Sequence, residues 1–73
     1  MAPDPEAQIQ TRYEALVETL NEAQRRLWAA AEARSFGRGG IAAVARATGM
    51  SRNTVLAGLK ELEDADHRER IAS

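Results

Sequence analysis

Three neighbouring polar residues, Ser51, Arg52 and Asn53, carry the most distinctive hydrogen-bonding chemistry in this sequence. They follow the short stretch "ATGM" and precede an apolar pattern, so we expect them at the start of a helix. An arginine guanidinium can form two parallel hydrogen bonds to guanine O6 and N7, and an asparagine carboxamide can pair in the same bidentate way with adenine N6 and N7. The residues therefore indicate a surface that reads base edges. An ordinary solvated first turn is the alternative.

Other polar side chains nearby suit contacts to backbone phosphates, which position a protein on a duplex without specifying sequence. Thr54 can reach a phosphate or a thymine methyl group, and Lys60 lies further along the same expected helix. The helix that begins near Gly39 and Gly40 also offers free backbone N–H groups to a phosphate. The candidate DNA-binding residues are Arg38, Arg46, Ser51, Arg52, Asn53, Thr54 and Lys60.

The distribution of charge favours the same interpretation, although the formal net charge is −1. Between residues 33 and 60 the sequence has five basic residues and no acidic one, whereas all eleven acidic residues lie outside this window. Asymmetry of charge along a chain is more informative than its sum. One end of the domain is therefore expected to face phosphates while the rest repels them. Chance segregation of charge in a small helical protein is the alternative.

The first half of the chain predicts two helices after a proline-bounded lead-in at residues 1–5. Asp4 suits the N-cap of the first helix, and Pro5 suits its first position. Asn21 is the expected cap of the second helix. The apolar stripe expected on the first helix is Ile9, Tyr13, Leu16, Val17 and Leu20. The apolar face expected on the second is Leu27, Trp28, Ala30 and Ala31.

The second half predicts two more helices, because "FGRGG" at residues 36–40 interrupts the helical pattern. Ser51 is the expected cap of the fourth helix, and the charged tail at residues 65–73 is expected to fray. No strand-like alternation occurs, so the prediction is an all-α, four-helix domain at residues 6–64. The expected inward residues are Ile41, Val44, Ala45 and Thr48 on the third helix, and Val55, Leu59 and Leu62 on the fourth.

The very short break between the third and fourth helices predicts a helix-turn-helix at residues 41–63. Such a turn needs a small residue where the helices cross, here Ala45, and a residue that tolerates positive φ, here Gly49. Met50 is expected to enter the core, and Val55 to lock the fourth helix against the third. The alternative is a tightly packed helical hairpin that binds protein, which explains the sterics but not the missing acids.

Several other functions have no support in the residues. The chain has no cysteine, so a disulfide framework and a thiolate metal site are excluded. His67 lies among charged residues and is expected to be solvated, and no catalytic set or nucleotide-binding loop is present. Trp28 is expected to anchor the core and not to stack on bases. We therefore expect a non-catalytic protein without cofactor or metal. No apolar run approaches the roughly 20 residues of a membrane span, so we also expect the protein to be cytoplasmic.

The stretch "LNEAQRRLWAAAEARSFGRGGIAAVARATGMSRNTV", residues 20–55, resembles the N-terminal region of bacterial DDE-type insertion-sequence transposases, the Rhodopirellula-type transposases. A looser likeness extends over residues 13–63. The combination of "RRLWAA", "GGI" and "VARATG-SR-T" carries it. The resemblance implies a helix-turn-helix that holds the terminal inverted repeats of the element. The residues that fall on family motif positions are Arg46, Ser51, Arg52 and Thr54, of which Arg52 is the foremost candidate for a base contact.

The sequence departs from the family pattern in two ways. The RNase H-like domain with Mg²⁺-binding acids that follows this region in the family has no counterpart here, so we expect a truncated or excised DNA-binding part. The positions just after "TV", basic in the family, are Leu56 and Ala57, which predicts weaker DNA binding. The alternatives are a stand-alone helix-turn-helix regulator of transcription and a protein-interaction module that uses the first helix, for example to bind another copy.

Overall fold

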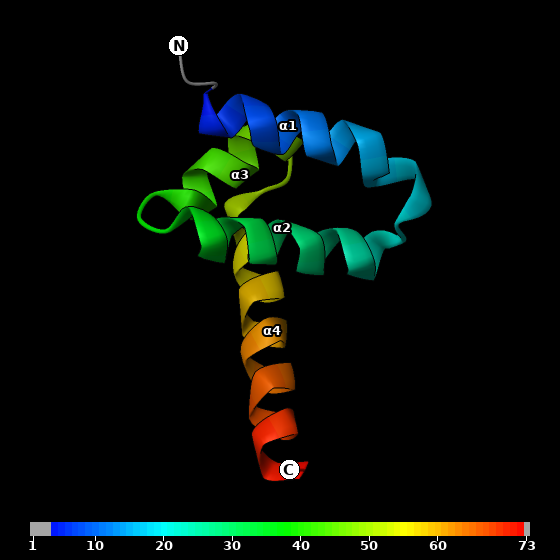
Figure 1. Ribbon diagram of the computed structural model, residues 1–73, viewed down its shortest axis with the longest axis vertical. Helices are drawn as coiled ribbons and strands as arrows, with labels where there is room; N and C mark the ends of the chain where they lie inside the picture. The colour runs from blue at the N-terminus through cyan, green and yellow to red at the C-terminus, as the bar shows by residue number, and fades with distance from the viewer. Residues whose placement is uncertain (1–3, 73) are drawn as a thin grey trace.

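The chain is all-α, as the sequence predicts. The computed structural model describes the backbone of residues 4–72 and the side chains of residues 4–67, and this part of the chain contains no strand. Residues 1–3 of the expected lead-in and residue 73 of the expected tail lie outside it. The helices are α1 (Pro5–Leu16), α2 (Glu22–Phe36), α3 (Gly40–Thr48) and α4 (Arg52–Ala72), with a 3₁₀ turn, η1 (Val17–Thr19), after α1 (Figure 1).

The predicted N-caps of α1 and α2 are confirmed. The Asp4 side chain accepts a hydrogen bond from the Glu6 backbone N–H at 3.1 Å, and Pro5 is the first residue of the helix. Asn21 and Gln24 form a reciprocal capping box, with side chain to backbone distances of 2.8 and 2.9 Å. These contacts satisfy backbone donors that have no partner inside a helix, so local chemistry alone determines where both helices begin.

A small core joins residues from all four helices. Its buried members are Ile9, Ala29, Ala33, Val44 and Val55, and Trp28, Ile41, Ala47 and Met50 pack against it. The ring of Trp28 also contacts Tyr13, with 5.5 Å between the ring centroids. Trp28 is therefore a core anchor, as predicted, and so are Val44 and Val55.

Two glycines without side chains allow the helices to cross closely. A methyl group at Gly40 would overlap the Ala33 carbonyl oxygen of α2, and one at Gly58 would overlap the Arg26 carbonyl oxygen. A Cβ at Gly58 would also lie 3.0 Å from Ala30 Cβ, closer than ordinary van der Waals contact. Both α3 and α4 thus pack directly against the backbone of α2. The sequence prediction assigned the close crossing to Ala45, and this packing on α2 was not foreseen.

The predicted apolar faces of α1 and α2 are partly wrong. Leu16, the last residue of α1, was expected inside but is 40% exposed. On α2 the predicted Ala30 is buried, but the predicted Ala31 is exposed, and Ala29 and Ala33, which were not predicted, are buried as well. The buried face of α2 is the one that receives Gly40 and Gly58, and small residues alone fit there.

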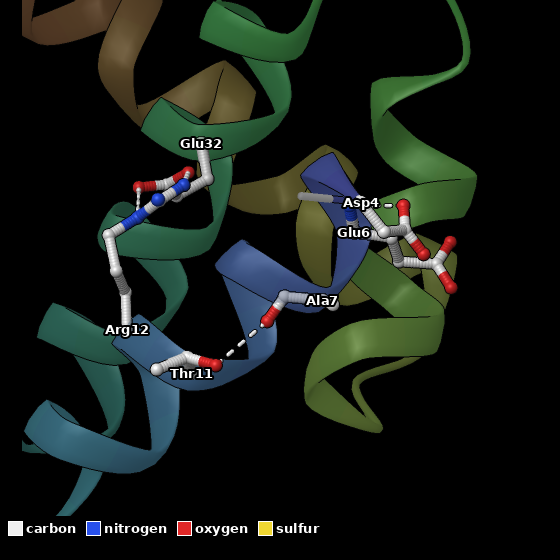
Figure 2. A network of polar contacts seen from close by, with 6 residues as sticks. All are labelled: Asp4, Glu6, Ala7, Thr11, Arg12 and Glu32. Atoms are coloured by element: carbon white, nitrogen blue, oxygen red, sulfur yellow. Dashed lines mark hydrogen bonds and ion pairs between the residues drawn. The ribbon is translucent and has the colours of Figure 1, made fainter. Parts of the chain in front are cut away.

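An exposed ion pair links α1 to α2. Figure 2 shows the Arg12 guanidinium extending from α1 to Glu32 of α2, with hydrogen bonds of 3.1 and 2.7 Å. The hydrogen bonds that Arg12 donates to the Glu32 carboxylate raise the pKa of Arg12 above its ordinary value. The same view shows the start of α1, where Asp4 caps the helix and the Glu6 carboxylate lies on the side away from Arg12. This ion pair and the ring contact of Tyr13 with Trp28 both join α1 to α2.

The last helix is longer than expected. In Figure 1, α4 crosses α2 near its own start and then extends away from the other three helices. The predicted tail at residues 65–73 was expected to fray, but the helix continues to Ala72. The described residues include no helix with the length and apolarity that crossing a bilayer requires.

Candidate nucleic-acid interface

The turn between α3 and α4 has the geometry that the residue types predict. Gly49 ends α3 in the left-handed region, at φ 77° and ψ 3°, and its N–H donates to the Ala45 carbonyl oxygen at 3.0 Å. Only glycine adopts this conformation without a steric penalty from Cβ. Met50 is half-buried and packs against the core, also as predicted. The turn thereby fixes the start of α4 relative to α3.

Ser51 caps α4, as predicted, and uses its hydroxyl group to do so. Ser51 Oγ accepts a hydrogen bond from the Thr54 backbone N–H at 3.1 Å, and the two hydroxyl groups share another at 2.8 Å. Thr54 is half-buried and lines a hollow of about 320 Å³ together with Tyr13 and Arg25. The structure therefore joins these two predicted site residues to each other, with Thr54 facing α1 and α2.

The exposed face of α4 begins at Arg52 and Asn53 and continues through Leu56, Ala57 and Lys60. At 1.5 Å per residue this face is about 12 Å long from the first of these residues to the last. A B-DNA major groove is about 12 Å wide and admits an α-helix. The acidic residues of α4 follow it, so the first turns of the helix present only neutral and basic side chains outward.

Two of the five basic residues between residues 33 and 60 are not free, because acids distant in sequence pair with them. Arg46, a candidate phosphate contact on α3, pairs with Glu6 of α1 at 2.7 Å, and Arg34 of α2 pairs with Asp66 of α4 at 3.0 Å. The window from residue 33 to residue 60 is thus free of acids in sequence but not in space. Within the described part of the chain, Arg38, Arg52 and Lys60 make no ion pair within 4.0 Å.

Arg52 lies beside the start of α3. It shares a hollow of about 350 Å³ with Gly37, Gly39, Gly40, Ile41 and Ala42. The expectation of a free N–H at Gly40 is wrong, because that group donates to the Gly37 carbonyl oxygen at 3.0 Å. The positive end of the α3 dipole nevertheless lies at this hollow. Arg38 lies between two glycines of the loop that lines this hollow, and it is exposed.

Sequence reasoning missed one feature of this surface, the acid Glu6, which neutralises one of the candidate cations. Leu56 is 48% exposed among the candidate contact residues, as its place just after "TV" predicts. No local signal connects Glu6 with Arg46, which is 40 residues away.

Comparisons with protein-family models, with curated proteins and with solved structures find no match to this chain. The described residues contain no group of three or more His, Asp or Glu side chains arranged to hold a metal ion. The geometry of α3, the turn and α4 is therefore the basis for a functional proposal.

Proposed function

We propose that this chain is a sequence-specific module for double-stranded DNA, in which α3 and α4 form a helix-turn-helix and the start of α4 enters the major groove. The observation that carries the proposal is the exposed, acid-free face of α4 at the end of a three-residue turn. Glycine in the left-handed region and the Ser51 cap hold that face clear of the core. A hairpin that serves packing alone requires neither unpaired cations nor exposed amide and guanidinium groups at this place.

In this proposal the contacts divide into two kinds. Arg52 and Asn53 read base edges through bidentate hydrogen bonds. Arg38 and Lys60, which make no ion pair within the described residues, contact phosphates on the two sides of the groove. Arg46 joins them when DNA competes with Glu6 for its guanidinium group. The main role of Ser51 and Thr54 is to position the helix through the cap. Contact of their hydroxyl groups with phosphate is a secondary role.

The resemblance to Rhodopirellula-type transposases supports a specific target, the terminal inverted repeats of a transposable element. We propose that the chain binds such ends in the cytoplasm without catalysing strand transfer itself. A small transcriptional regulator would use the same contacts on a different site. The selected DNA sequence distinguishes them, because transposon ends occur as inverted pairs that flank a transposase gene.

The test begins with selection of preferred duplexes from a pool with a randomised central segment. On the selected duplex, Arg52→Ala is expected to cost about 1–3 kcal/mol of binding free energy and to relax the preference at one base pair. Arg52→Lys is the matched control: it keeps the charge but loses the bidentate geometry, so it should retain binding to random duplexes and lose the preference. Equal losses on selected and random duplexes would show that Arg52 contacts phosphate only.

The competing proposal, a protein-binding module that uses the apolar stripe of α1, has less support in the structure. Ile9 of the predicted stripe is buried, and Tyr13 packs against Trp28. Leu16 is the member of the stripe that is clearly exposed. A complex formed through such an apolar contact would be nearly insensitive to added salt, whereas DNA binding would weaken steeply.

A further inference from the structure

Leu56 is the large apolar side chain with the greatest exposure in the described residues, at 48%, and it lies on the face of α4 assigned to DNA. It follows Arg52 by one helical turn, so the two side chains are neighbours along the helix. Ala57 has the same relation to Asn53. An isolated exposed leucine needs no explanation on an ordinary surface. Leu56, however, lies between Lys60 and the residues proposed to read bases, on the same face of α4.

The charges around Leu56 indicate which class of molecule binds this face of α4. Between residues 52 and 60 the exposed charged residues of α4 are Arg52 and Lys60, and both are positive. Neither of these two side chains makes an ion pair within the described part of the chain. A polyanion therefore fits this face. The apolar feature that a DNA major groove presents is the C5-methyl group of thymine. The small side chain of Ala57 beside Leu56 lets the helix approach the floor of the groove.

We propose that Leu56 reads thymine by contacting its C5-methyl group, one to two base pairs from the base that Arg52 contacts. This inference rests on the proposed DNA-binding function and adds the class of target: sites with thymine at a fixed distance from the guanine bound by Arg52. The distance follows from geometry, because one turn of helix rises about 5.4 Å and successive base pairs are about 3.4 Å apart. In this proposal Leu56, at a position that is basic in the transposases that residues 20–55 resemble, confers specificity in place of phosphate affinity.

The test replaces thymine with uracil, which removes only the methyl group. Each thymine of the selected duplex is replaced in turn by deoxyuridine, and binding is measured by fluorescence anisotropy. Loss of one buried methyl contact is expected to weaken binding about fourfold at one position. With Leu56→Ala, the affinity for the thymine duplex divided by the affinity for the deoxyuridine duplex should fall close to one. Leu16→Ala removes the other exposed leucine, on α1, and should leave the ratio unchanged, while melting of each variant confirms folding.

Three results would overturn the inference, and they separate it from the proposed function. Salt-sensitive binding that no uracil substitution weakens refutes thymine reading and leaves DNA binding intact. A uracil effect that persists in Leu56→Ala assigns the methyl contact to another residue. Absence of salt-sensitive binding to the duplex pool refutes the inference and the proposed function together.

Discussion

Replacement of Gly58 with alanine tests the crossing that places α4 on the domain. A methyl group there would overlap the Arg26 carbonyl oxygen and lie 3.1 Å from its carbonyl carbon and 3.0 Å from Ala30 Cβ. Two of the three atoms belong to the backbone, so no change of side-chain rotamer relieves the overlap. The helices must separate, and the buried contact of Val55, one turn earlier on α4, is loosened.

The size of the effect comes from two opposing terms. Forcing a methyl group into a packed helix crossing costs about 1–3 kcal/mol, or more when backbone must move. Alanine in a helix is favoured over glycine by about 1 kcal/mol. Because the overlap is with backbone, we expect a net destabilisation of about 1–2 kcal/mol, a large share of the roughly 3–5 kcal/mol available to a domain of this size. The melting temperature should fall by about 4–8 °C for each kcal/mol.

Thermal unfolding followed by circular dichroism measures this, with Ala57→Gly as the control. That variant makes the reverse exchange at the adjacent, exposed position, so it reports helix propensity without packing and should cost about 1 kcal/mol. If Gly58→Ala raised the melting temperature by as much as Ala57→Gly lowered it, α4 would not cross α2 at this residue, and the placement of the proposed DNA-binding face would be wrong.

Three further variants test the turn and the charges around it. Gly49→Val should destabilise the domain by about 1–3 kcal/mol, because a β-branched residue is forced to positive φ although space is open around it; an unchanged melting temperature would contradict the left-handed turn. Glu6→Gln should free Arg46 and tighten binding to random duplexes by up to the 0.2–1 kcal/mol typical of an exposed ion pair, or about 1.4- to 5-fold, and unchanged affinity would place Arg46 outside the interface. Leu56→Arg combined with Ala57→Arg should tighten binding to random duplexes and steepen its salt dependence by about 0.9 per new phosphate contact, with little change in melting because both positions are exposed. A large loss of stability without tighter binding would refute this orientation of α4.

Features that depend on local chemistry were predictable from the sequence. The caps at Asp4, Asn21 and Ser51 each satisfy a backbone donor two or three residues away, and a glycine after a short helix signals a left-handed turn. The helical character and the two glycine-containing breaks follow from the same kind of short-range rule. None of these required knowledge of which helix packs against which.

Features that depend on distant residues were not predictable. Alanine carries little information about burial, so the pattern could not show that Ala31 faces solvent and Ala33 the core. Gly58 lies inside a helix, where it looks like a weakness until α2 is seen against it. The pairing of Arg46 with Glu6 changes the charge of the candidate site, and it arises only when α1 and α3 pack together.

The salt dependence of duplex binding tests the proposed DNA contact of α4 most directly. The logarithm of the association constant, plotted against the logarithm of salt concentration, should have a slope of about −2 if Arg38 and Lys60 each neutralise a phosphate. Arg38→Ala and Lys60→Ala should each make the slope shallower by about 0.9, whereas Arg12→Ala, which removes an arginine from the α1–α2 side, should leave it unchanged. A slope near zero, or a slope that neither variant alters, would contradict DNA binding through this face.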